Sequence, residues 1–210
     1  MVSLSTDRED PSNHHHCGGT LVSSHYVVTA ASCVTWTEDG SAAVMHPSNL
    51  WVTIGEHRTS DQNETHMENI IGVANIHIHG GFSRANEHLH NIALLELDTV
   101  VNLYDYAPAC LADTRDYFDG LMAQVYGFGV FDSDSEGTLH EANVTIVKNT
   151  ECSAASIRLQ SSIRPGILCA GAGGDTEKGP CEVRLKMEKS QQYQKQSYFR
   201  LGDTLTRGVL

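Results

Sequence analysis

The chain consists of short apolar or alternating runs that turn residues interrupt at close intervals. The runs are residues 20–23, 26–31, 50–54, 69–78, 92–97, 123–126, 142–147 and 167–169. Most have the length and alternation typical of β-strands, and turn pairs such as Asp39-Gly40 and Gly80-Gly81 lie between them. Before the C-terminal stretch, only residues 149–159 have a convincing helical pattern. This spacing predicts an all-β barrel or sandwich.

The length and charge of the chain limit what it can bury and bind. At 210 residues with 40% hydrophobic content, it can bury one large core or two small ones. No window of eighteen or more apolar residues occurs, so the sequence predicts no membrane-spanning helix. The formal net charge of −12 argues against nucleic acid and anionic membranes as partners. We therefore expect a soluble globular protein.

A boundary is expected near Glu182. Residues 1–182 carry 8 Lys and Arg against 24 Asp and Glu, whereas residues 183–210 carry 6 against 2. At the same point the strand-like runs give way to a polar stretch rich in Lys, Gln and Glu. Because few β-branched residues follow, we predict a weak surface helix or no fixed structure over residues 183–200. The sequence thus divides into residues 1–182 and a divergent, poorly packed polar tail, residues 183–210.

Five short motifs follow one another in a fixed order within residues 1–182. They are Cys17-Gly-Gly-Thr-Leu21, Tyr26-Val-Val-Thr-Ala-Ala31, Asn91-Ile-Ala-Leu-Leu-Glu-Leu97, Val125-Tyr-Gly-Phe-Gly129 and Ile167-Leu-Cys-Ala-Gly171. In this order they make the chain similar to trypsin-like serine proteases of the chymotrypsin family. The resemblance implies two antiparallel β-barrels of six strands each with a cleft between them, over about residues 1–100 and 101–182. Because the sequence diverges after Glu182, we expect the second barrel to be incomplete.

The resemblance also locates two catalytic positions, and neither holds the residue typical of the family. Such an enzyme needs a serine nucleophile, a histidine base and a buried aspartate that orients the imidazole. Ser32 stands at the histidine position, and a hydroxyl cannot act as a base near neutral pH. Asn91 stands at the aspartate position, where an Asp to Asn change costs about 10⁴-fold in kcat. We therefore expect a degenerate catalytic triad.

The loop that would carry the nucleophile is absent. In the family, a cysteine and one further residue precede Gly-Asp-Ser-Gly-Gly-Pro, which supplies the serine and the backbone donors of the oxyanion hole. Here Cys181-Glu182 continues directly into Val183-Arg184. By the same resemblance, the base of the specificity pocket falls at Gly179 and lacks an acidic residue. The sequence thus predicts no measurable peptidase activity and an undefined substrate preference.

The six cysteines divide into two expected disulfides and two unpaired thiols. The resemblance implies the disulfides Cys17–Cys33 and Cys152–Cys169, and it leaves Cys110 and Cys181 without partners. Each disulfide closes a loop of about 16 residues, which adds about 3 kcal/mol in the chain-entropy model. In many relatives the position of Cys110 bonds to an upstream light chain or pro-segment. An intermolecular disulfide through Cys110 is therefore expected.

Cysteine content and two glycosylation sequons indicate an extracellular setting. The sequons begin at Asn63 and Asn143, and six cysteines suit an oxidising compartment. The N-terminal residues, however, lack the basic region and apolar run of a secretory signal. We therefore interpret the chain as a piece of a longer secreted precursor.

Histidine clusters are the remaining candidate for a site. The pairs His77-Ile-His79 and His88-Leu-His90 would each place two imidazoles on one face of a strand, as metal sites require. A third cluster, residues 14–16, is expected in a loop. No carboxylate or cysteine is placed as a further ligand, and the acidic run 132–137 lacks the full spacing of a calcium loop. We predict neither a specific metal site nor a cofactor.

Two functions remain open at this point. In the first, the chain is a pseudoprotease that acts by binding another protein, for example in a proteolytic cascade. In the second, it is a truncated or mis-spliced product of a gene for an active secreted serine endopeptidase. The abrupt change after Glu182 favours the second, whereas Ser32 and Asn91 lie far upstream of such a junction and argue against it. A third class, a metal-binding or structural β protein, rests only on the histidines.

Overall fold

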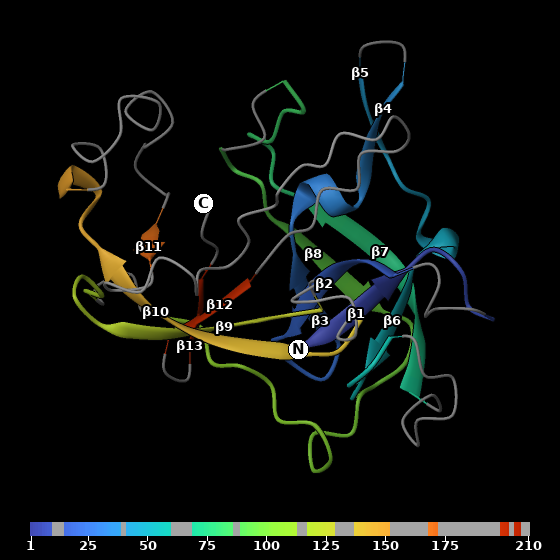
Figure 1. Cartoon of the computed structure of the whole chain (residues 1–210). Helices are drawn as coiled ribbons and strands as arrows, with labels where there is room; N and C mark the ends of the chain where they lie inside the picture. Colours follow the sequence, from blue (N-terminus) through green and yellow to red (C-terminus); the bar gives the residue numbers. More distant parts are fainter. Residues whose placement is uncertain are drawn as a thin grey trace.

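Six strands close into an antiparallel barrel in the N-terminal half of the chain. The computed structural model describes residues 1–9, 15–38, 41–59, 69–85, 89–112, 117–128, 137–151, 168–171, 198–201 and 204–206. The barrel strands are β1 (Val2–Ser5), β2 (His15–Leu21), β3 (Tyr26–Thr29), β6 (Trp51–Ile54), β7 (Ile70–Ile78) and β8 (Ala93–Leu97). Their order is β1-β2-β3-β8-β7-β6, and β1 pairs with both β2 and β6. The predicted first barrel is confirmed (Figure 1).

Apolar side chains from all sides of the barrel fill its interior. Leu4, Val27, Val52 and Leu95 come from four different strands, and each is 0% exposed. Full burial of such a side chain is worth about 1.5–3 kcal/mol. Gly19 on β2 allows close packing, because a Cβ at this position would lie 2.8 Å from Cγ1 of Val27. The short apolar runs of the sequence therefore fold into one continuous core.

The second sheet is open. Its strands are β9 (Met122–Gly127), β10 (His140–Val147), β11 (Cys169–Gly171), β12 (Tyr198–Leu201) and β13 (Thr204–Thr206), in the order β11-β10-β9-β12-β13. Its small core consists of Ala123, Val125, Val144, Ile146 and Ala170. Within the described ranges no pairing joins β11 to β13. The second sheet is thus less closed than the first barrel, as predicted, and lies beside it in Figure 1.

Two loop segments connect the barrel to the second sheet. The backbone N–H of Leu139 donates to the carbonyl of His57 at 2.7 Å, and that of Thr59 donates to Gly137 at 2.8 Å. These bonds form a short antiparallel bridge between residues 57–59 and 137–139. The two sheets are therefore joined by backbone hydrogen bonds as well as by the connecting chain.

The C-terminal tail differs from the sequence-based expectation. We predicted a weak helix or no fixed structure over residues 183–200, yet β12 begins at Tyr198 and pairs with β9 through Tyr126, Val125 and Gln124. The sequence contained a signal for this hairpin, because Gly202-Asp203 separates two β-prone runs by two residues. Pairing with β9 satisfies backbone groups that an edge strand would leave open. The tail therefore contributes to the second sheet.

The predicted loop around the first histidine cluster is wrong, because His15 and His16 belong to β2. His14 lies outside the described residues.

Three smaller elements complete the described fold. The hairpin of β4 (Thr35–Glu38) and β5 (Ser41–Val44), followed by the 3₁₀ turn η2 (Pro47–Asn49), was not predicted. Of the expected helix over 149–159, residues 149–151 are helical and the rest lies outside the described ranges. None of the helices in the described residues is long and apolar enough to cross a membrane.

Candidate functional site

Ser32 and Asn91 lie next to each other in the folded chain, although 59 residues separate them in sequence. Ser32 is the middle residue of η1 (Ala31–Cys33), which follows β3 after the single residue Ala30. Asn91 lies two residues before β8. Because β3 and β8 are antiparallel neighbours, with Thr29 opposite Ala93, the end of one strand meets the beginning of the other. Barrel pairing therefore brings together the two residues that the sequence predicted at the catalytic positions.

Two hydrogen bonds join the pair. The backbone N–H of Ser32 donates to Oδ1 of Asn91 at 2.8 Å. Nδ2 of Asn91 donates to Oγ of Ser32 at 2.9 Å. Asn91 is only 5% exposed, and Ser32 is partly buried. Since a buried amide without partners costs about 1–3 kcal/mol, these contacts are a stabilising feature of this edge of the barrel.

The backbone around Asn91 is held in an unusual conformation. His90 has a positive φ of 54°, which is uncommon for a residue other than glycine. The N–H of Ile92 donates to the carbonyl of His90 at 2.8 Å, and the N–H of His79 donates to the carbonyl of Ile92 at 3.1 Å. The imidazole rings of His79 and His90 stack, with centroids 4.6 Å apart and planes 5° from parallel. This turn directs Asn91 toward Ser32.

Arg84 is a further residue at this site, and no sequence pattern identified it. Its Nη1 lies 3.5 Å from the backbone carbonyl oxygen of Ser32, a long and weak hydrogen bond. This contact involves only the backbone carbonyl of Ser32, so the hydroxyl of Ser32 still accepts its hydrogen bond from Asn91. Arg84 therefore adds a positive charge near the pair but no group that can accept a proton.

The chemistry available to the pair is limited. A carboxamide nitrogen has no free lone pair at neutral pH and acts here as the donor toward Ser32, so it cannot remove the hydroxyl proton. The carboxamide oxygen of Asn91 accepts the backbone N–H of Ser32, where the family's aspartate would orient an imidazole. The arrangement thus has the geometry of an orienting residue and its partner, without a base.

The remaining cysteine positions differ in what the structure shows. Cys17 and Cys33 form the disulfide that the resemblance implies, and it joins β2 to η1 beside Ser32. Cys169 is also disulfide-bonded. Cys110 is a free, exposed thiol. The expected partner Cys152 and the unpaired candidate Cys181 lie outside the described residues.

Three other predicted positions can be located only in part. Asn143 is exposed on β10, so its sequon is accessible on the surface. Asn63, Gly179 and the sequence that follows Glu182 lie outside the described residues. The acidic run 132–137 is described only at Gly137, which has a positive φ of 79°.

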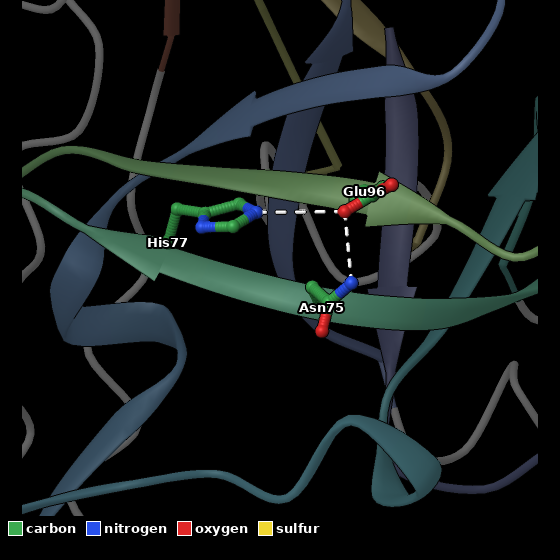
Figure 2. A network of polar contacts seen from close by, with 3 residues as sticks. All are labelled: Asn75, His77 and Glu96. Atoms are coloured by element: carbon green, nitrogen blue, oxygen red, sulfur yellow. Dashed lines mark hydrogen bonds and ion pairs between the residues drawn. The ribbon is translucent and has the colours of Figure 1, made fainter.

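The fold separates His77, which lies on β7, from His79. His77 Nε2 lies 3.5 Å from Oε2 of Glu96 on the neighbouring strand, and Nδ2 of Asn75 donates to the same oxygen at 2.8 Å (Figure 2). The hydrogen bond from Asn75, and then that from His77, lowers the pKa of Glu96 below its usual value. His79 instead lies beyond the end of β7 and stacks on His90. Within the described part of the chain, no group of three or more His, Cys, Asp and Glu side chains is arranged to hold a metal ion.

A closed six-stranded β-barrel beside a second, less closed antiparallel sheet defines a protein of the trypsin-like serine protease fold class. The Trypsin family model matches residues 1–182. The chain is 28% identical over 166 residues to trypsin alpha of Drosophila erecta, covering 78% of this chain and 59% of the relative. It is 30% identical over 194 residues to human mannan-binding lectin serine protease 1, covering 84% of this chain and 27% of the relative.

The solved structures include the same fold. Mouse neuropsin, described as a serine protease expressed in the limbic system of the brain, superposes with a TM-score of 0.65 at 24% identity. The superposition covers 97% of this chain and 78% of neuropsin. The chain spans 59% or less of the length of the curated relatives named above. It belongs to the trypsin family of serine proteases and their homologues.

Proposed function

We propose that this chain is a non-catalytic member of the trypsin family that acts by binding another protein. The observation that carries the proposal is the hydrogen-bonded pair of Ser32 and Asn91, the residues to which the resemblance assigns the positions of the catalytic base and its orienting acid. Neither side chain can accept the proton of an attacking serine at neutral pH. The two residues instead hydrogen-bond to each other, as expected when they stabilise the fold.

The sequence around the nucleophile position supports the same proposal. No Gly-Asp-Ser-Gly-Gly segment occurs in the chain, so neither the serine nor the oxyanion-hole glycines have a counterpart. Residual catalysis in triad-deficient proteases depends on the oxyanion hole. Loss of base, orienting acid and nucleophile together leaves a scaffold whose surface is its functional part.

An extracellular location accompanies this proposal. The Cys17–Cys33 disulfide is characteristic of proteins in oxidising compartments. The free and exposed Cys110 is positioned for an intermolecular disulfide with a partner protein. The exposed sequon at Asn143 adds a site for glycosylation in that setting.

One observation favours a second candidate. The Trypsin family match ends at residue 182, where the composition of the sequence also changes. This would follow if the chain were a truncated or mis-spliced product of a gene for an active secreted endopeptidase. Such a product would still lack a base at Ser32. Reading the genomic sequence past the codon for Glu182 separates the two candidates, because a continuation into Gly-Asp-Ser would support the second.

A labelling experiment tests the loss of catalysis. The purified chain is exposed to a serine-directed fluorophosphonate probe and to a broad set of peptide substrates, beside active trypsin and the Ser32→Ala variant. We expect labelling and turnover no higher than for Ser32→Ala. The variant Ser32→His, alone or with Asn91→Asp, should also stay inactive, since a nucleophile is still missing. Turnover that exceeds the Ser32→Ala control would contradict the proposal.

A further inference from the structure

A cavity of about 400 Å³ opens on the first barrel, away from Ser32 and Asn91. It lies between β6, the beginning of β7 and the segment that follows β8. Its lining residues belong to these three segments and to the residues after β1, and those used below are Arg8, Trp51, Gly72, Asp98, Val100 and Asp105. The volume falls within the range of about 300–1,000 Å³ that is typical of ligand sites. The cavity is large enough to receive a side chain of a partner, but too small to be a whole protein interface.

Two carboxylates give the cavity its charge. Asp98 accepts a hydrogen bond from Oγ1 of Thr99 at 3.0 Å, and Asp105 accepts one from Nδ2 of Asn102 at 2.7 Å. A carboxylate has about four acceptor positions, so each retains capacity for a ligand. Within the described residues neither carboxylate forms an ion pair. In this part of the chain the two carboxylates are therefore oriented by hydrogen bonds from neutral neighbours.

The position of Asp98 depends on a glycine. A Cβ at Gly72 would lie 2.3 Å from Oδ2 of Asp98 and 3.2 Å from Cζ3 of Trp51. The backbone N–H of Asp98 donates to the carbonyl of Gly72 at 3.0 Å. Only glycine at position 72 thus lets the carboxylate lie directly against β7. The fold places this negative charge at the wall of the cavity by a specific backbone contact.

Arg8 is the cation among the lining residues, and its guanidinium lies over an aromatic ring. The carbon Cζ of Arg8 is 5.1 Å from the centroid of the Trp51 ring, within cation–π range. With Asp98 and Asp105 opposed by Arg8 alone, the lining retains a net negative charge. The whole chain carries a formal net charge of −12, which adds to the attraction for a basic partner.

The segment that lines the cavity also carries exposed apolar side chains. Val100 is 60% exposed and lines the cavity, while Leu103 is 42% exposed and Tyr104 is fully exposed, and both lie between the lining residues Asn102 and Asp105 in sequence. Protein interfaces combine a central anchor pocket with surrounding apolar and aromatic contacts. The segment that supplies Asp98 and Asp105 therefore also supplies the surface that would surround an inserted side chain.

We propose that this cavity binds a lysine or arginine side chain of the protein partner, with apolar residues on either side of it packing on Val100 and Leu103. The inference rests on the proposed function as a binding protein and names the surface that performs it. Charge complementarity selects the basic side chain, because the cavity offers two carboxylates that have no ion-pair partner in the described structure. The former catalytic positions take no part in this contact.

The test uses the ¹⁵N-labelled full chain and three peptides that differ at one position. The probes are Ac-Ala-Leu-Arg-Leu-Ala-NH₂ and the same peptide with norleucine or glutamate in place of arginine. Amide resonances are followed during titration to millimolar peptide. We expect the arginine peptide to shift the resonances of Gly72, Asp98 and Asp105, with an affinity at least 5-fold above that of either other peptide. Binding should weaken as salt increases, because the attraction is between exposed charges.

Variants identify the residues responsible. The double change Asp98→Asn and Asp105→Asn should lower the affinity for the arginine peptide at least 5-fold. The control Glu141→Gln removes one exposed carboxylate on β10 and should change the affinity less than 2-fold. Equal binding of the norleucine peptide, tighter binding of the glutamate peptide, or an unchanged affinity in the double variant would each overturn the inference, as would the absence of any shift.

Failure here is distinguishable from failure of the proposed function. If the fluorophosphonate probe labels the chain while the arginine peptide still shifts these resonances, the proposal that the chain is non-catalytic is wrong. The site for a basic side chain is then still supported. If labelling is absent and the peptide does not bind, the site is wrong and the chain remains a non-catalytic homologue.

Discussion

The Ser32–Asn91 pair gives the most direct test of the structure, because its contribution to folding can be isolated. Asn91→Ala removes the acceptor of the Ser32 N–H and the donor to its Oγ. Each hydrogen bond contributes about 0.5–1.5 kcal/mol net, so the two together are worth about 1–3 kcal/mol. With a denaturation slope of about 2 kcal/mol per molar urea, a loss of about 2 kcal/mol lowers the midpoint by about 1 M.

A double-mutant cycle separates this pair from the other contacts of Asn91. Ser32→Ala removes the bond between Oγ and Nδ2 and keeps the backbone N–H that donates to Asn91, and the double variant carries both changes. Other contacts of either residue cancel in the cycle, whereas the shared hydrogen bond does not. We expect a coupling free energy of about 1 kcal/mol from urea denaturation of the four proteins. If the losses of unfolding free energy in the two single variants sum to that of the double variant within about 0.3 kcal/mol, the hydrogen-bonded arrangement is refuted.

Three further predictions concern the barrel itself. Cys33→Ala breaks the disulfide that closes a 16-residue separation, and should cost about 3 kcal/mol in calorimetry, whereas Cys110→Ala should leave stability nearly unchanged because that thiol is free and exposed. Leu95→Ala in the core should lower the free energy of unfolding by about 2–5 kcal/mol, against about 0.5 kcal/mol or less for the exposed Leu103→Ala. Glu96 has a pKa held below its usual value, so its ionised form stabilises the fold above the unfolded pKa, and this is lost as pH falls through the folded pKa. The melting temperature of Glu96→Gln should therefore lie below that of the parent chain at pH 7 and approach it below pH 4, and an equal difference at both pH values would contradict the assigned network.

Much of the first barrel could be predicted from the sequence. The runs that contain Val27, Val52 and Leu95 have the length and alternation of strands, and each forms one. The beginning of β2 was missed because His15, His16 and two glycines lack strand propensity. Its pairing with β1 overrides that local preference, since the barrel closes only when every edge finds a partner.

The tail shows the opposite kind of error. Its composition suggested that residues 183–200 lack a fixed fold, and composition averages over a whole window. The run from Tyr198 to Leu201 is local, and its pairing with β9 satisfies an edge that the second sheet presents. The pocket around Asp98 and Gly72 was likewise invisible in sequence, because its walls come from segments that are far apart along the chain.

The sequence by itself determined the family and the strand-rich class, because these depend on residue types in a fixed order. It could not determine that Ser32 and Asn91 satisfy each other, since a hydrogen bond across 59 residues exists only after β3 and β8 pair. Nor could it place Gly72 against Asp98. That contact forms only when β7 packs beside the residue that follows β8, and a Cβ at position 72 would clash with the carboxylate. The order of the residues determines which chemical groups are present, whereas the distances between those groups are set only when the barrel closes.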